Sequence, residues 1–441
     1  MKRYVVLLWL SLPFSLGAQN IETIAGGGTI LGDGGPATSA NLKVFGQLAI
    51  DSYGNIIIAA NNDARIRKVD AATGIITTIG GTGVQNYSGD GGPATSAEFD
   101  WPNFVACDAH NNVYISDHSD RIRKINAVTG IVTTIAGTGL PAFTGDGGPA
   151  TAAAIYAPEG IVFDLEGNLY FCDHSNARIR KIDTNGIITT IAGTGITGHS
   201  GDGGPALLAE ISAWGLAIDN FGDLYFSYGA YVRKIDMSTG IISTVAGYGA
   251  VVYNGEGIPA TSAGIGPIKV AFDVNNRMYI TDAFNHRIRM VDNNGLIYTV
   301  AGIGTQGFAG DGGPATAAQF YSPHGIEYFC GNIYVADVQN KRVRKIIYNT
   351  NTTCPLGINP ITTTLLTFTL SPNPATSQIT ITGNHKLKEI TLCNTLGQPV
   401  LYQSCKTEKL TLDIELLPAG VYFINVVDAN GGKRTEKLVK Q

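Results

Sequence analysis

The side chains with the clearest chemical potential are four aspartates at equivalent points of a repeated sequence: Asp117, Asp173, Asp282 and Asp337. His118 and His174 directly follow two of them. Carboxylates and imidazoles bind divalent metals, so these positions are candidate metal ligands. Two other copies carry Ala60 and Tyr228 at this point, and an aspartate heading a loop commonly accepts hydrogen bonds from the backbone. The sequence leaves open a divalent metal or a turn cap, and it predicts no other cofactor.

A second set of positions differs in every copy, although the residues around it hardly change. These positions lie in a Pro-x-Gly segment or its equivalent: Phe45, Asn103, Glu159, Trp214, Ile268 and His324. In a ring of copies they encircle one end of a central channel, with Glu159 opposite His324, an arrangement that suits acid–base or metal chemistry. We expect this ring, with nearby Asp173, His118, His174 and Lys269, to bind a ligand. The alternative is free variation at an exposed rim.

A repeat carries these positions. Its first marker is Gly-Asp-Gly-Gly-Pro-Ala-Thr, whose acidic residues are spaced 54 to 57 residues apart: Asp33, Asp90, Asp146, Asp202, Glu256 and Asp311. A second marker, close to Arg-Ile-Arg-Lys, recurs at 65–68, 121–124, 178–181, 232–234, 287–289 and 342–345. A repeat of about 40 to 60 residues with several strand-like runs is typical of a propeller blade.

Each copy predicts four strands. In the third copy, β-branched runs at 160–164, 169–173, 178–183 and 187–192 are separated by Gly, Asn and Asp turns. After the predicted signal peptide the chain begins with a fourth-strand segment at Ile21–Ala25, and the sixth copy ends after its third strand. Pairing these two closes the ring and protects its edges. The predicted fold is all-β: a six-bladed β-propeller with four-stranded blades closed by the N-terminal strand, plus a small C-terminal Ig-like β-sandwich.

The two markers are predicted to be structural. A phosphate loop needs Lys-Ser/Thr after its glycines, and a calcium loop needs further carboxylates; neither follows here. We expect a tight turn with Pro at position N1 of one helical turn. The Arg-x-Arg-Lys strands lack the aromatic interleaving of single-strand binders. We expect their cations to pair with aspartates at strand ends: Asp51, Asp108, Asp164 and Asp219.

The repeat resembles the NHL-repeat propellers. The matching phrases are Pro-x-Gly-Ile, Asp-x-x-Gly-Asn-Leu-Tyr, Asn-x-Arg-Ile-Arg-Lys and Ile-Thr-Thr-Ile-Ala-Gly, which recur over residues 20–349. The resemblance implies a propeller. Similar scaffolds include RNA-binding, adhesion, sensor, lyase and lactonase domains, so the fold leaves the function open.

The ends of the chain have other patterns. Lys2-Arg3, an apolar run and Gly17-Ala18 predict a signal peptide over 1–18, ahead of a propeller over 19–349. A Pro/Thr-rich linker is expected at 350–365, and short alternating strands over 366–441 predict the β-sandwich. No transmembrane segment is predicted, because no stretch reaches about 20 apolar residues. The six cysteines lack Cys-x-x-Cys spacing, and their pairing stays open.

The last segment closely resembles the C-terminal sorting domain of the type IX secretion system of Bacteroidota. The motif residues are Pro372, Asn373, Pro374, Gly397, Gly420 and Tyr422, within phrases that run to Lys440. The resemblance implies passage through the periplasm, the type IX secretion machinery as a partner, and a final location that is secreted or attached to the outer surface.

The net charge of −5 gives no basic field for nucleic acid, and the predicted destination also argues against such a partner. The sequence shows no triad spacing, metal motif or nucleotide loop. We therefore expect a non-catalytic binding or adhesion module for an extracellular glycan or protein. The alternative is a secreted, metal-assisted lyase or lactonase with its site at the channel mouth.

Overall fold

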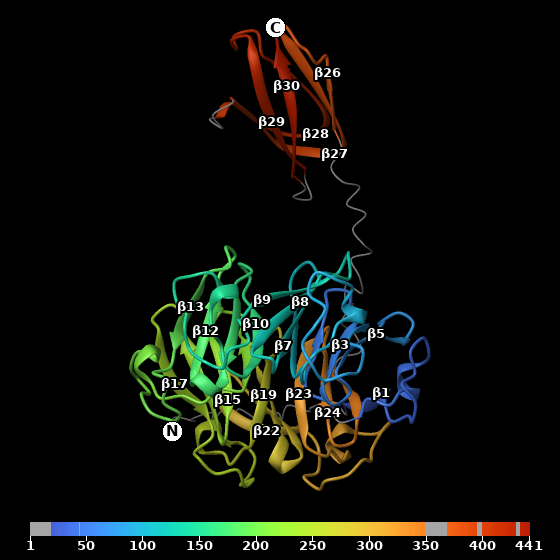
Figure 1. Ribbon diagram of the computed structural model, residues 1–441, viewed down its shortest axis with the longest axis vertical. Coiled ribbons are helices and arrows are strands. Elements are labelled where there is room, and N and C mark those ends of the chain that lie inside the picture. Colours follow the sequence, from blue (N-terminus) through green and yellow to red (C-terminus); the bar gives the residue numbers. More distant parts are fainter. Residues whose placement is uncertain (1–18, 44, 349–367, 395–398, 429–432) are drawn as a thin grey trace, which may run out of the picture. The chain divides into compact units, whose positions relative to one another are not determined.

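The structure is a computed structural model, and it describes residues 19–43, 45–348, 368–394, 399–428 and 433–441 (Figure 1). The chain divides into two compact units, Met1–Pro355 and Leu356–Gln441. The predicted signal peptide at 1–18 and linker at 350–365 lie outside the described residues.

The first unit is built of repeated antiparallel sheets, formed by strands that follow one another along the chain except where the N-terminal strand joins the last sheet. Within residues 19–43 and 45–348 there are six, numbered here as sheets 1 to 6. Sheet 1 comprises β2 (Leu48–Ile50), β3 (Ile56–Ala60), β4 (Arg65–Val69) and β5 (Ile76–Gly80). Sheet 2 comprises β6 (Phe104–Cys107), β7 (Val113–Asp117), β8 (Arg121–Ile125) and β9 (Val132–Ala136). Sheet 3 comprises β10 (Pro158–Phe163), β11 (Leu169–Asp173), β12 (Arg178–Ile182) and β13 (Ile188–Ala192). Sheet 4 comprises β14 (Gly215–Ile218), β15 (Leu224–Tyr228), β16 (Tyr231–Asp236) and β17 (Ile241–Ala246). Sheet 5 comprises β19 (Pro267–Phe272), β20 (Met278–Asp282), β21 (Arg287–Val291) and β22 (Leu296–Ala301), extended by β18 (Ile258–Pro259). Sheet 6 comprises β23 (Pro323–Phe329), β24 (Asn332–Asp337), β25 (Arg342–Ile347) and β1 (Asn20–Gly26).

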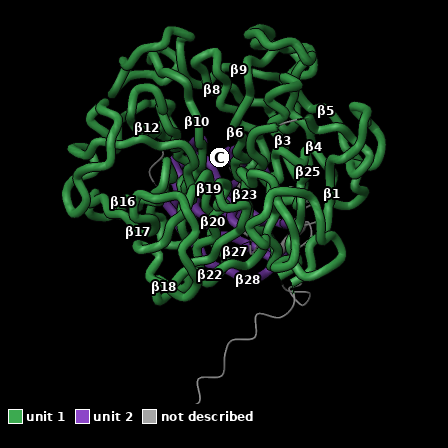
Figure 2. The backbone as a smooth tube through the Cα atoms, turned by 90° about the horizontal axis from the view of Figure 1, so that it is seen from below, with its two compact units in different colours: residues 1–355 green, residues 356–441 purple. Residues whose placement is uncertain are grey.

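The first strand of each sheet is the innermost. Contacts link β2 to β6, β6 to β10, β10 to β14, β14 to β19, β19 to β23 and β23 back to β2. Figure 2 shows β6, β10, β19 and β23 near the centre of this unit, and β1, β5, β16 and β17 at its edge. Repeated four-stranded sheets in this order have the architecture of a β-propeller.

The N-terminal strand completes the last sheet, as predicted. β1 pairs antiparallel with β25, from Asn20 opposite Ile347 to Gly26 opposite Arg342. The apolar faces of neighbouring sheets pack on each other; Ile21, for example, is buried in a cluster with Phe320 and Ile346. In the third copy β11 coincides with its predicted range, and the other three strands differ from theirs by one or two residues at their ends.

One arginine in the third strand of each sheet is buried and holds the loop of the first marker. The guanidiniums of Arg67, Arg123, Arg180, Arg233, Arg289 and Arg344 lie 2.5–3.6 Å from the acidic residue of that loop. Arg123, which is fully buried, also donates to the carbonyls of Ser88 and Glu98 at 2.9 and 3.0 Å. A buried cation needs such partners, because removing it from water is costly.

This pairing corrects the sequence interpretation. The expected partners Asp108, Asp164 and Asp219 cap their own turns instead; Asp108, for example, accepts hydrogen bonds from the N–H groups of His110 and Asn112. Asp51 does lie 3.8 Å from Lys68, and it also caps its own turn. The carboxylate closest to each buried arginine comes from the loop, and in four sheets the aspartate that ends the second strand lies 3.4–3.9 Å away as a second partner.

Short 3₁₀ turns, rather than α-helices, begin at the last two residues of the first marker. They are η1 (Ala37–Ser39), η3 (Ala94–Ser96), η4 (Ala150–Ala152), η6 (Ala206–Leu208), η7 (Ala260–Ser262) and η9 (Ala315–Ala317). The proline precedes each turn with ψ near 130°, so it stands at the N-cap and not at N1 as predicted. Three more follow second strands: η2 (Asn61–Asp63), η5 (His174–Asn176) and η8 (Ala283–Asn285).

The second unit is a single sheet network with a separate hydrophobic core. Its strands are β26 (Phe368–Ser371), β27 (Gln378–Cys393), β28 (Pro399–Asp413), β29 (Gly420–Asp428) and β30 (Lys433–Lys440). The expectation of short, separate strands in this unit is wrong in two places. The runs at 379–381 and 390–392 join in β27, and those at 400–402 and 410–414 join in β28, because the chain continues through a register shift instead of turning.

The sorting motif ties the two ends of this unit together. The side chain of Asn373 donates to the carbonyl of Lys437 at 2.8 Å and accepts from the N–H of Val439 at 2.9 Å. The hydroxyl of Tyr422 donates to the carbonyl of Pro418 at 2.9 Å. Gly420 opens β29, and Gly397 lies outside the described residues. Among the cysteines, Cys330 is disulfide-bonded, and Cys107, Cys172, Cys393 and Cys405 are free.

Replacing a buried arginine is expected to be much more destabilising than replacing its outer neighbour. Arg123→Met leaves Asp90 and fully buried Asp117 without their cation, and we expect a loss of about 3–5 kcal/mol in the free energy of unfolding. Arg121→Met is the control, since its partly exposed guanidinium donates to two carbonyls, and a loss of about 1–2 kcal/mol is expected. Chemical denaturation would measure both; equal losses would contradict the role given to Arg123.

Candidate functional site

The structure brings the six variable residues of the repeat into one pocket, called here the ring pocket. Phe45, Asn103, Glu159, Trp214, Ile268 and His324 all line it, and its volume is about 260 Å³. They lie at or just before the first residues of the innermost strands, such as Glu159 in β10 and Trp214 before β14. The equivalent positions in six sheets therefore face one space.

Glycine allows the inner strands of neighbouring sheets to approach each other closely. The N–H of Gly160 donates to the carbonyl of Trp214 at 2.8 Å, and a Cβ at Gly160 would lie 2.4 Å from that oxygen. At Gly215 a Cβ would lie 2.2 Å from the carbonyl of Ile268. Any side chain here would push neighbouring inner strands apart. The glycines next to the ring positions thus allow adjacent sheets to meet, and the preceding residues to line the pocket.

The polar side of the ring pocket is centred on Glu159, which is 5% exposed. Its carboxylate accepts from the side-chain amide of Asn103 at 2.7 Å and lies 3.1 Å from Nε2 of His118. The hydrogen bond to this carboxylate is the main factor that raises the pKa of His118 above its usual value of 6.5. A buried carboxylate and a histidine whose cationic form it stabilises therefore share one wall.

His324 has a different environment. Its ring Nε2 lies 3.1 Å from the hydroxyl of Ser322, and burial lowers its pKa to about 4. The imidazole is therefore neutral at physiological pH. Within the described residues no hydrogen bond or ion pair joins it to Glu159, whose partners belong to sheet 2. Glu159 and His324 line the same pocket, but they are not a paired acid and base.

Of the four neighbours expected beside the ring, only His118 lines the pocket. Asp173 is buried beneath Arg180. His174 lies beside the pocket, where its Nδ1 is 2.9 Å from the carbonyl of Ala213. Lys269 follows a ring residue, but its side chain enters the central channel.

Sequence reasoning missed several residues that line the ring pocket, including Gln47, Asn61, Trp101, Val338 and Gln339. Trp101 is 43% exposed, and its backbone has a φ of 44°. Asn61 and Val338 occupy the position of His118, directly after the second strand, and this position also varies between copies. Applying the same comparison of copies to that position could have found both residues.

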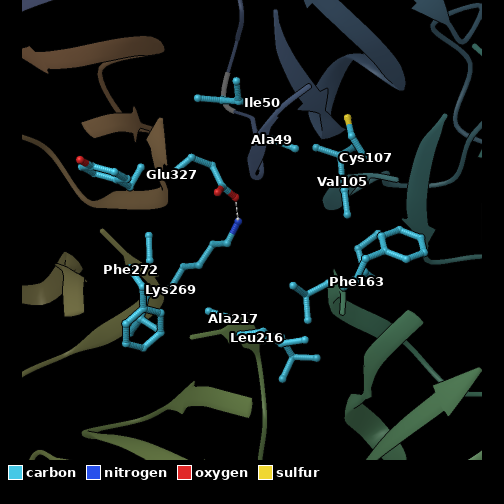
Figure 3. Close-up of a pocket in the computed structure, with 17 residues that line it drawn as sticks. Ala49, Ile50, Val105, Cys107, Phe163, Leu216, Ala217, Lys269, Phe272 and Glu327 are labelled. Carbon is cyan, nitrogen blue, oxygen red and sulfur yellow. Dashed lines mark hydrogen bonds and ion pairs between the residues drawn. The ribbon is translucent and has the colours of Figure 1, made fainter. Parts of the chain in front are cut away.

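The central channel holds a second cavity, of about 250 Å³, lined by the later residues of the same six inner strands. Its walls are largely aliphatic, with Ala49, Val105 and Leu216 among them. Figure 3 shows Lys269 and Glu327 pointing toward each other across it, with Nζ and Oε1 2.5 Å apart. One ion pair between the neighbouring sheets 5 and 6 thus places two charged groups among these aliphatic side chains.

The four candidate metal ligands are not brought together. Asp117, Asp173, Asp282 and Asp337 end the second strands of four different sheets, and each lies 3.4–3.9 Å from its own buried arginine. Burial is the main cause that raises the pKa of Asp117, Asp173 and Asp337 to about 6 and that of Asp282 above its usual value. No group of three His, Cys, Asp or Glu side chains that could hold a metal occurs in the described part of the chain.

Comparison with known families finds a match to one segment in each part of the chain. Residues 369–441 match the secretion system C-terminal sorting domain, and residues 139–198 match the Teneurin NHL domain. The chain carries a type IX sorting domain behind a propeller-like unit with NHL repeats. Such a domain indicates a protein that is secreted or attached to the outer surface. The described residues contain no helix long and apolar enough to cross a membrane.

Two relatives show how far the likeness extends. Teneurin-1 of Homo sapiens is 31% identical over 283 residues, which is 54% of this chain and 10% of Teneurin-1. The chloroplastic protein SUPPRESSOR OF QUENCHING 1 of Arabidopsis thaliana is 26% identical over 326 residues, 70% of this chain and 30% of that protein. The chain thus spans less than a third of the length of either relative.

Solved structures show the same fold. A protein of unknown function from Bacteroides thetaiotaomicron has a TM-score of 0.54 and 20% identity, covering 75% of this chain and 76% of its own. An auxiliary nutrient binding protein from Bacteroides ovatus has a TM-score of 0.54 and 15% identity, covering 74% and 76%. At such identities the likeness concerns the fold alone.

The two histidines of the ring pocket are expected to titrate far apart. NMR of the imidazole signals should give His118 a pKa above 6.5 and His324 a pKa of about 4. Glu159→Gln removes the carboxylate, so the pKa of His118 should fall toward 6.5 while that of His324 stays unchanged. An unchanged His118 in this variant would contradict the hydrogen bond to Glu159.

Proposed function

We propose that this protein is a secreted or surface-attached binding module that holds an extracellular glycan in its ring pocket without transforming it. The six sheets serve as the six blades of one closed propeller, and the C-terminal unit is an Ig-like sandwich used for export. The observation that carries the proposal is the ring pocket itself. It gathers the residues that vary from copy to copy, whereas the residues that build the sheets are nearly constant.

The chemistry of the ring pocket favours a sugar over a purely apolar ligand. Trp101 and Trp214 supply aromatic surface, against which the C–H face of a sugar ring packs. Asn103, Glu159 and His118 supply donors and acceptors already aligned by their hydrogen bonds to one another. A mostly apolar pocket with a few oriented polar groups is the usual form of a small-ligand site.

The support for a binding role over catalysis is the way the charged groups are engaged. Glu159 is hydrogen-bonded to Asn103 and His118, so its carboxylate serves to orient side chains. The neutral imidazole of His324 interacts with Ser322. These contacts suit a pre-formed recognition surface, in which little ordering is needed when the ligand binds.

Ligand binding in the ring pocket can be followed by intrinsic fluorescence. The tryptophans of the chain are Trp9, in the predicted signal peptide, and Trp101 and Trp214, which both line the pocket. We expect residues 19–441 to bind a surface glycan with a change in fluorescence, and Glu159→Ala with Trp214→Ala to weaken binding at least about tenfold. Leu165→Ala, at an exposed turn outside the pocket, is the control and should bind normally.

A glycan array identifies the ligand for this titration, and mass spectrometry then shows its fate. The ligand is expected to be recovered intact. Undiminished binding by the double variant would contradict the location of the site. Cleavage of the ligand would contradict a non-catalytic role and favour a lyase or lactonase.

Export should depend on the second unit. Deleting residues 366–441 removes the sorting domain, and the protein is expected to remain in the periplasm of a bacterium that has the type IX machinery. Fractionation and immunoblotting measure this, with Lys388→Ala, an exposed change in the same unit, as the control. Appearance of the deleted form outside the cell in normal amounts would contradict the role of the domain.

A further inference from the structure

Sheet 4 departs from the repeat at the turn between its second and third strands. β15 ends at Tyr228, where four other sheets carry aspartate. Two residues, Gly229 and Ala230, join β15 to β16, whereas four residues join β11 to β12 in sheet 3. The third strand then begins with Tyr231 in place of arginine. Three features of the repeat are therefore lost together at one place.

The missing aspartate leaves two hydrogen-bond donors of its usual surroundings in place. In sheets 2, 3, 5 and 6 its carboxylate accepts a backbone N–H at 2.7–3.2 Å, from Asp100, Tyr156, Gly266 and Tyr321. Ser212 holds this position in sheet 4, and no described residue accepts a hydrogen bond from its N–H. The buried Arg233 has one carboxylate partner, Asp202, whereas Arg180 has two.

The space left at this turn is a pocket of about 310 Å³, called here the sheet-4 pocket. Ser212 and Arg233 line it, and Phe226, Tyr228, Tyr231 and His199 supply aromatic walls. His199 stacks on Tyr231 at 3.6 Å between ring centroids. In sheet 3 the corresponding pair is Phe143 and Arg178, with the guanidinium carbon 3.7 Å from the ring centroid. Both members of the pair therefore differ in sheet 4, where they stack on each other and together form one wall of the pocket.

We propose that the sheet-4 pocket binds a small aromatic carboxylate, whose carboxylate group replaces the aspartate that the chain lacks here. It accepts from the N–H of Ser212 and the guanidinium of Arg233, while its ring packs among the aromatic walls. A carboxylate suits this place because four sheets already hold one beside the same cation. The site is separate from the ring pocket and goes beyond the function proposed there.

The probes are benzoate and 4-hydroxyphenylacetate, with benzamide as the uncharged control, titrated into residues 19–441 by calorimetry. We expect saturable binding with a Kd of about 1 mM or tighter for the carboxylates and none for benzamide. Tyr228→Asp restores the residue of the other sheets and should weaken binding at least about tenfold, by filling the site with the chain's own carboxylate. Ala60→Asp makes the same kind of change in sheet 1 and should leave binding unchanged.

Chemical-shift mapping on the unsubstituted protein does not depend on the folding of any variant. Benzoate is expected to shift the amide of Ser212, the side chain of Arg233 and the ring of His199, and to leave His118 and His324 in place. The variant Glu159→Ala with Trp214→Ala should bind benzoate normally, which separates this site from the ring pocket. Absence of binding, equal binding of benzamide, shifts elsewhere, or full binding by a folded Tyr228→Asp protein would each overturn the proposal.

Discussion

The buried arginine of each third strand is the interaction on which the rest of the first unit depends. Its guanidinium links the loop of the first marker to the sheet through a carboxylate and loop carbonyls, as Arg344 does with Asp311, Ala309 and Gln319. The loop leads directly into the innermost strand. Fixing the loop therefore fixes the start of that strand, where the residues of the ring pocket lie. Because a buried cation without partners is strongly unfavourable, the arrangement admits little local variation.

This constraint explains how recognition and architecture are divided among the residues. The cation, its loop carboxylate and the small residues of the inner strands keep the sheets nearly identical. In most sheets the ring position carries no charge and takes no part in the arginine–carboxylate network. Residues as different as Phe45, Trp214 and Ile268 can therefore stand at this position without disturbing the network. Sheet 4 shows the complementary case, since the loss of one carboxylate beside Arg233 leaves the sheet intact and opens a cavity. Variation is tolerated where the remaining partners still neutralise the arginine.

The strands and the pairing of the N-terminal segment could be predicted because β-branched runs and Gly turns recur with a fixed period. The same repeat also predicted that the variable ring residues would line one common opening. The partner of Arg123 could not be predicted, since Asp90 reaches it only through the path of a loop that propensities do not describe. The direction of Trp101 depends on a positive φ, and that of Lys269 on which way the chain turns after Ile268. Symmetry thus predicted positions, whereas side-chain orientation required the backbone in three dimensions.

The pairing of β1 with β25 has a consequence for the order of folding. Its partners are separated by more than three hundred residues, from Asn20 to Ile347, so the ring cannot close until nearly the whole first unit has been synthesised. Contacts between such distant residues make folding slow, because the entropy of closing the loop is lost before the contact is gained. The nascent chain consequently keeps this unit open while it is being made.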